Sequence, residues 1–257
     1  IDSGLYQKLT NEELLIPHET VSSSPLPSSG RYLTIRPEPI PFVSYPYEWC
    51  FTQLKHAAQA TLAIMKHALN HGMILKDANA YNIQFYQGKP ILIDTLSFEK
   101  YQEGKPWMAY KQFCESFLGP LALMSFKDIR LSTLLREYVN GIPLDLVSSL
   151  LPKRTYLKFY LITNIHLHDK YQNKYADKAS LNSSTKSMRK HSLLGLIDSL
   201  ESAINELNWS PLKSEWANYY NECSHVTTFL EEKINLINNY LDFLKPKNLW
   251  DLGANTG

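Results

Sequence analysis

The sequence has little cysteine, no long apolar run and almost no net charge, and each shortage excludes a class of protein. Three cysteines in 257 residues, Cys50, Cys114 and Cys223, lie far apart, which argues against a disulfide-stapled secreted domain and a structural zinc site. No apolar run approaches the roughly 18 residues of a membrane-spanning helix. A net charge of +1 excludes a chain-wide attraction to nucleic acid. We expect a cytoplasmic protein without a membrane span, although the first residue, Ile1, makes a missing leader peptide uninformative.

What remains is an ordinary globular composition. Hydrophobic residues make up 44% of the chain and charged residues 20%, and the length suits one large or two modest domains. A chain of this size buries roughly 70% or more of its unfolded surface when it folds. Only ten glycines are present, which excludes a collagen-like chain.

The first half of the chain predicts an extended segment, a helix and a hairpin. Residues 17–47 are rich in proline, which excludes long helices, and residues 31–36 predict a short strand. Apolar residues at helical spacing predict a helix over residues 48–70 that ends at Gly72. Two β-rich runs, 82–86 and 90–94, flank a turn that contains glycine and predict a hairpin.

The second half predicts mostly helix. We expect helices from residue 106 to about 179, with breaks at Gly119-Pro120, Gly141-Ile142-Pro143 and Pro152. The polar, basic residues 180–192 predict a linker or mobile loop. We then expect two further helices, over residues 193–207 and 226–244, and a buried strand over residues 248–252.

Three polar residues around the predicted hairpin form the first chemical pattern. Asp77 precedes Asn82 by five residues, and Asp94 follows Asn82 by twelve. Phosphoryl transfer needs a carboxylate that accepts a hydroxyl proton, and an amide and a second carboxylate that hold Mg²⁺ against the phosphates. Asp and Asn also favour turns for local reasons, so turn capping stays open as an alternative.

This pattern resembles the catalytic loop and metal-binding Asp of the protein-kinase and aminoglycoside-phosphotransferase superfamily. The resemblance implies that Asp77 is the catalytic base and that Asn82 and Asp94 bind Mg²⁺ beside ATP. Leu75 replaces the expected His, and no G-x-G-x-x-G phosphate loop lies upstream. No lysine of the V-A-I-K type is present either; Arg36 could replace it, with Glu48 as its partner, although arginine is not equivalent to lysine there.

The last seven residues, DLGANTG, form the second pattern. An apolar stretch runs into a small, glycine-rich loop, where glycine lets the backbone approach a ligand closely. The stretch resembles motif I of class I S-adenosylmethionine (SAM)-dependent methyltransferases. That resemblance implies that Asp251, Gly253, Asn255 and Gly257 contribute to the SAM-binding loop. A glycine-rich turn without a ligand is the alternative, and the stretch cannot form a SAM site by itself.

Together the segments resemble bacterial class I methyltransferases with a long kinase-like N-terminal region, some of which are labelled nodulation-protein-like. The segments that carry the resemblance are residues 41–49, 75–82, 93–99, 117–123, 165–168 and 251–257. The expected fold class is α+β: a helix-rich, aminoglycoside-phosphotransferase-like region, then a helical connector and the first strand of a truncated Rossmann-like methyltransferase domain. The expected boundaries are 1–179, 180–225 and 226–257.

The sequence leaves several functions open. The first hypothesis is the N-terminal part of a SAM-dependent methyltransferase, whose kinase-like region binds substrate or nucleotide or acts as a scaffold; its methyl acceptor and oligomeric state are not implied. The alternatives are an ATP- and Mg²⁺-dependent small-molecule phosphotransferase, a catalytically inactive pseudokinase-like binding module, and a helical interaction protein. His166 and His168 are expected to be structural, because residues two apart on a helix cannot share a metal ion. Cys114 is expected to be a core residue.

Overall fold

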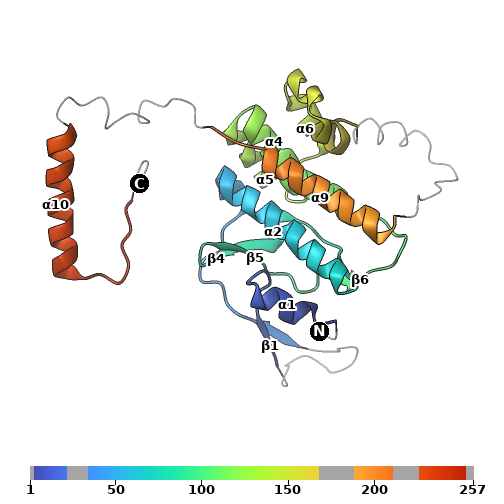
Figure 1. The fold of residues 1–257 in the computed structure, drawn as a ribbon, viewed down its shortest axis with the longest axis horizontal. Helices are drawn as coiled ribbons and strands as arrows, with labels where there is room; N and C mark the ends of the chain where they lie inside the picture. Colours follow the sequence, from blue (N-terminus) through green and yellow to red (C-terminus); the bar gives the residue numbers. More distant parts are fainter. Residues whose placement is uncertain (1–2, 22–33, 168–187, 211–225, 253–257) are drawn as a thin grey trace. The chain divides into compact units, whose positions relative to one another are not determined.

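A computed structural model of the protein describes residues 3–21, 34–167, 188–210 and 226–252 (Figure 1). The chain divides into two compact units, residues 1–209 and residues 210–257. The first unit combines helices with three two-stranded sheets among its described residues. The candidate site around Asp77 lies in this unit.

The central helix of the first unit is α2, Phe51–Asn70, drawn in light blue in Figure 1. Its predicted apolar face is confirmed, because all five residues of that face are fully buried: Leu54, Ala58, Leu62, Met65 and Leu69. The helix ends as predicted, since Gly72 follows it with a φ of 70°, a conformation that glycine adopts without a steric penalty.

The strands next to α2 hold the candidate site. β3, Met73–Leu75, pairs antiparallel with β6, Phe98–Lys100. β4, Ile83–Tyr86, and β5, Lys89–Leu92, form the predicted hairpin. Its two turn residues, Gln87 and Gly88, have φ values of 50° and 79°, as a two-residue type I′ turn requires. The second strand ends at Leu92, so Asp94 lies just beyond the hairpin and not at the end of the strand as predicted.

The N-terminal residues cover one edge of this hairpin. After α1, Leu5–Asn11, Leu15 forms a parallel bridge to Leu92 of β5. β1, His18–Thr20, then pairs antiparallel with β2, Ile35–Pro37. The strand predicted over residues 31–36 therefore appears only in its last residues, and positions 31–33 lie outside the described residues.

The helical region begins with a continuous run, and the break predicted at Gly119-Pro120 is wrong. α3, Tyr110–Phe113, passes through a π-helical turn, Cys114–Leu118, into α4, Gly119–Phe126. In this turn the N–H of Gly119 bonds to the carbonyl of Cys114, five residues back. Such a wide turn gives the following proline, which lacks an N–H, room that an α-helical turn does not provide.

Short helices complete this region. They are η4, Ile129–Thr133; α5, Leu134–Glu137; α6, Leu144–Leu150; η5, Lys153–Leu157; α7, Phe159–Leu161; and η6, a π-helix over Ile162–His166. The predicted breaks at residues 141–143 and at Pro152 fall between helices and are confirmed. Residues 168–179, predicted to continue the helices, lie outside the described residues.

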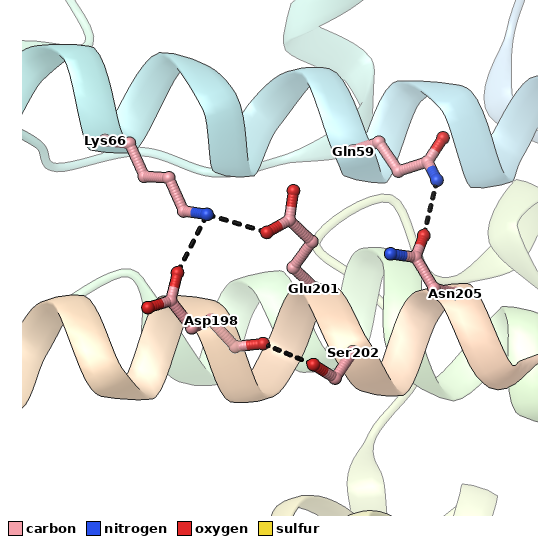
Figure 2. Close-up of polar contacts among 6 residues, drawn as sticks. All are labelled: Gln59, Lys66, Asp198, Glu201, Ser202 and Asn205. Carbon is pink, nitrogen blue, oxygen red and sulfur yellow. Dashed lines mark hydrogen bonds and ion pairs between the residues drawn. The ribbon is translucent and has the colours of Figure 1, made fainter.

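Helix α9, Lys190–Glu206, packs against α2 in the first unit. Its apolar face is buried, and Figure 2 shows the polar contacts beside it. Lys66 Nζ lies 2.8 Å from Asp198 and 2.6 Å from Glu201. Burial lowers the pKa of Lys66, but these two carboxylates outweigh it and raise the pKa overall. α9, expected in the connector between the domains, therefore belongs to the first compact unit.

In the second unit, α10, Val226–Leu244, forms as predicted. The buried strand predicted over residues 248–252 is wrong, because these residues have no strand conformation and Trp250 is 83% exposed. A strand is stable only when it pairs with a neighbour and buries a face, and the described part of this unit contains no other strand.

Among the described helices of both units, none combines the length and the apolar character that a membrane-spanning helix needs.

Two glycines with positive φ allow a matched test of the packing around the π-helical turn. At Gly141, with a φ of 107°, an added Cβ would lie 2.6 Å from the Cβ of Glu115. At Gly88, with a φ of 79°, an added Cβ would meet nothing within 4 Å. We predict that Gly141→Ala lowers the free energy of unfolding by about 3–5 kcal/mol, from strain and overpacking together, and Gly88→Ala by only about 1–2 kcal/mol. Urea denaturation of both variants measures the difference, and equal losses would contradict this packing.

Candidate functional site

The loop between β3 and β4 carries Asp77 and Asn82, and its own side chains shape it. Asp77 Oδ1 accepts the N–H of Asn79 at 3.0 Å. Asn79 Oδ1 in turn accepts the N–H of Tyr81 at 3.0 Å, at the start of η2, Ala80–Asn82. These are two successive Asx turns, which Asp and Asn form readily.

Side chains and carbonyls from other elements fasten this loop on several sides. Trp107 Nε1 donates to the carbonyl of Leu75, immediately before the loop, at 2.7 Å. Three further bonds hold the loop itself: Ala78 N–H to Gln112 Oε1 at 2.7 Å, Asn79 Nδ2 to the Val139 carbonyl at 3.1 Å, and the Tyr81 hydroxyl to the Leu135 carbonyl at 2.9 Å. The loop is therefore held by tertiary contacts, as a preorganised site requires.

Ser97, the residue immediately before β6, connects the parts of the site. Its hydroxyl donates to Asp94 Oδ2 at 2.6 Å and accepts from Asn82 Nδ2 at 3.4 Å. Its carbonyl accepts the N–H of Lys76, the residue before Asp77, at 2.8 Å. Because Ser97 is fully buried, these bonds fix its position. The residue thus connects the Asp77 loop, Asn82 and Asp94.

The three predicted site residues meet only in part. Asn82 and Asp94 share the Ser97 hydroxyl, and the Asn82 carbonyl accepts the N–H of Ile93 at 2.9 Å. The Asp77 carboxylate accepts the N–H of Asn79 and, among the described residues, forms no hydrogen bond with Asn82 or Asp94. The structure thus connects the two predicted Mg²⁺ ligands through Ser97, and the predicted base, Asp77, lies on the same loop as Asn82 with a separate hydrogen bond.

The Asp94 carboxylate and the Asn82 amide carry oxygen atoms, the kind of ligand that Mg²⁺ prefers. One Asp94 oxygen accepts from Leu96 N–H at 2.8 Å and the other from Ser97, yet each carboxylate oxygen retains a further lone pair. Mg²⁺ is commonly held by one or two protein oxygens together with phosphates and water. Across the described ranges, no group of three or more His, Cys, Asp or Glu side chains is placed to hold a metal. A metal at Asn82 and Asp94 would therefore depend on ligand oxygens.

The pairing suggested between Arg36 and Glu48 does not form. Arg36 bonds to Glu19 on the neighbouring strand at 3.0 Å. Glu48 accepts the N–H of Tyr45 at 2.8 Å, within its own helical turn, η1, Pro46–Glu48. The two residues have local partners, so this part of the kinase-like pattern has no replacement at these positions.

Two residues weighed as secondary candidates are structural. His166 is buried between two hydroxyls, with Nδ1 2.8 Å from Ser148 and Nε2 3.0 Å from Thr155; His168 lies outside the described residues. Cys114 is fully buried, and burial raises the pKa of its thiol to about 12. Because the thiolate is the reactive form, the predicted core role of Cys114 is confirmed.

Of the four residues predicted for the SAM loop, only Asp251 lies within the described residues. Asp251 is exposed, and Gly253, Asn255 and Gly257 lie outside the described residues.

Ser97 was not identified from the sequence as the residue that connects Asn82 and Asp94. The spacing Asp94-x-x-Ser97 is a usable signal, because a Ser three residues after an Asp can close a turn on its carboxylate.

We predict that Ser97→Ala separates the two halves of the site. The change removes the hydroxyl that Asp94 and Asn82 share, and we expect the free energy of unfolding to fall by about 1–2 kcal/mol. Ser149→Ala is the matched control, since that exposed hydroxyl bonds only to the Leu146 carbonyl at 2.8 Å, and we expect less than about 0.5 kcal/mol. The urea midpoints of both variants measure the loss of stability, and equal midpoints would show that the Ser97 hydroxyl does not stabilise the connection between Asn82 and Asp94.

Comparison with known proteins gives one curated relative. The chain is 33% identical over 219 residues to the nodulation protein NoeA of Rhizobium meliloti (strain 1021), an alignment that covers 84% of this chain and 46% of NoeA. No protein-family model matches the chain, and no solved structure matches it. The chain thus spans about half the length of the curated relative it matches, and its similarity to a nodulation protein is confirmed.

Proposed function

We propose that this chain is the N-terminal part of a SAM-dependent methyltransferase of the cytoplasm, and that its first unit is a kinase-like module that binds a nucleotide or phosphorylated substrate with Mg²⁺. The observation that carries the proposal is the Ser97 connection, which brings Asn82 and Asp94 together beside the fastened Asp77 loop. A carboxylate and an amide supply the oxygen atoms that suit Mg²⁺ arriving with phosphates.

Binding is better supported than phosphoryl transfer. Transfer requires cations that stabilise charge on the moving phosphoryl group. Among the described residues, no Lys or Arg side chain bonds to Asp77, Asn82 or Asp94, and Arg36 is paired with Glu19. A binding module of the pseudokinase type therefore accounts for the geometry, and a phosphotransferase that uses Asp77 as base is the alternative.

The methyltransferase half of the proposal rests on the residues after α10. DLGANTG has the glycines of motif I, and an amphipathic helix precedes it. The relative NoeA is about twice as long as the matched stretch, so we propose that a longer parent protein contains the rest of the SAM site. Its methyl acceptor would be a small molecule or another acceptor whose chemistry these residues do not specify.

A thermal-shift prediction tests the proposed Mg²⁺ site. We expect ATP with Mg²⁺ to raise the melting temperature by about 5–10 °C at 100 times Kd, equivalent to about 2.7 kcal/mol, and ATP with EDTA to give no shift. Asp94→Ala should abolish the shift. The matched control is Asp128→Ala, because Asp128 forms the same kind of turn, with Arg130 N–H at 2.9 Å, outside the site. An unchanged shift in Asp94→Ala would overturn the proposed ligand role.

The same samples separate binding from transfer. Release of inorganic phosphate or labelling of an added small-molecule hydroxyl from γ-labelled ATP, with loss in Asp77→Asn, would support the phosphotransferase. Binding without turnover would support the pseudokinase-type module.

A further prediction concerns the proposed SAM site and uses the complete natural protein that contains this chain. Isothermal titration should show SAM binding that Gly253→Val abolishes, since a side chain there would obstruct the close backbone approach that motif I glycines allow. Asp94→Ala should leave SAM binding unchanged. Absence of SAM binding in the wild-type protein would remove the methyltransferase assignment and leave the Mg²⁺-site result unaffected.

A further inference from the structure

A short exposed segment, residues 153–159, combines apolar and basic side chains; we call it the 153–159 tip. It comprises η5, Lys158 and the first residue of α7, and it follows α6 in Figure 1. Leu157 is 87% exposed, Phe159 77% and Tyr156 44%. Large apolar side chains gathered at such exposure indicate a surface that contacts something else.

The charge of the tip has one sign. Lys153, Arg154 and Lys158 are exposed, and the sequence contains no Asp or Glu between Asp145 and Asp169. None of the three cations forms an ion pair with a described residue; the Arg154 side chain donates only to the Phe126 carbonyl, at 3.3 Å. Their charge is therefore available to an external anion.

Buried contacts anchor the 153–159 tip to the rest of the first unit. Thr155, in its middle, is fully buried, and its hydroxyl donates to the Pro152 carbonyl at 2.7 Å. The Tyr156 ring stacks on the buried His166 ring with centroids 3.9 Å apart. In a 3₁₀ helix residues three apart lie on one side, so Arg154 and Leu157 project together. The exposed side chains of Leu157 and Phe159 therefore lie on a segment that buried contacts anchor to the first unit.

We propose that the 153–159 tip docks on the surface of an anionic lipid bilayer, with Leu157 and Phe159 in the interfacial region and the three cations among the headgroups. Lysine is depleted in the cores of protein–protein interfaces, whereas its long stem suits a membrane interface with the ammonium in water. Each such cation strengthens binding to an anionic surface roughly fivefold. The inference is independent of the proposed function, and it requires no spanning helix.

Co-sedimentation of the full 257-residue chain with vesicles tests the proposal. We expect binding to vesicles of phosphatidylcholine with phosphatidylglycerol, weakening as salt is raised, and little binding to phosphatidylcholine alone. Failure to bind the anionic vesicles at low salt would overturn the proposal.

Variants assign the binding to the tip. Leu157→Glu with Phe159→Glu should abolish it, and the matched control is Phe42→Glu with Met108→Glu, whose side chains are 75% and 76% exposed elsewhere on the surface. Circular dichroism and the melting temperature verify that each variant folds. If both pairs weaken binding equally, the tip is not the docking surface.

A second set of variants separates the specific cations from net charge. Changing Lys153, Arg154 and Lys158 to Gln should weaken binding roughly 100-fold. The control changes Lys76, Lys100 and Lys105, three exposed lysines outside the tip, to Gln and removes the same charge with a smaller loss expected. Equal losses would attribute binding to overall charge. Concentration-dependent self-association that Leu157→Glu abolishes, without vesicle binding, would assign the tip to a second copy and overturn the proposal.

Discussion

The antiparallel pairing of β3 with β6 is the constraint on which the candidate site depends. It places Ser97 against Lys76, so the residue before Asp77 bonds to the residue that holds Asp94 and Asn82. Without this pairing, the Asp77 loop and the Asp94 turn would be two separate polar turns. The buried face of α2 supports the arrangement from behind, since Met65 Sδ accepts the N–H of Leu75 at the end of β3.

The site is well fastened, but among the described residues no Lys or Arg side chain bonds to Asp77, Asn82 or Asp94, and this contrast guides the function that we propose. Preorganised polar groups lower the cost of binding, because they need no reordering when the ligand arrives. Stabilising a transferring phosphoryl group needs cations as well. The described contacts meet the first requirement at Asn82 and Asp94 and not the second, which is why we propose a ligand-binding module for the first unit.

Local patterns in the sequence predicted the elements that depend on neighbours in the chain. The apolar spacing located α2, and the glycine-containing turn located the β4–β5 hairpin. Elements that depend on distant partners were harder to predict. The π-helical turn that accommodates Pro120 was missed, and residues 248–252 have a strand-like sequence but no partner strand within the described part of their own unit. Propensity is a weak guide where tertiary contacts decide.

The same distinction separates Asp94 from Asp128, two acids with nearly identical local turns. Each accepts the N–H two residues ahead, at 2.8 Å and 2.9 Å. Asp128 completes its bonds with the side chain of Arg130, the residue whose backbone N–H it accepts, whereas the turn of Asp94 reaches Asn82 through Ser97. A turn-capping role explains every contact of Asp128. It does not explain why Asp94 is connected through Ser97 to the Asn82 amide, fifteen positions before Ser97 in the chain, and this non-local connection is the physical basis on which we propose a ligand at Asp94.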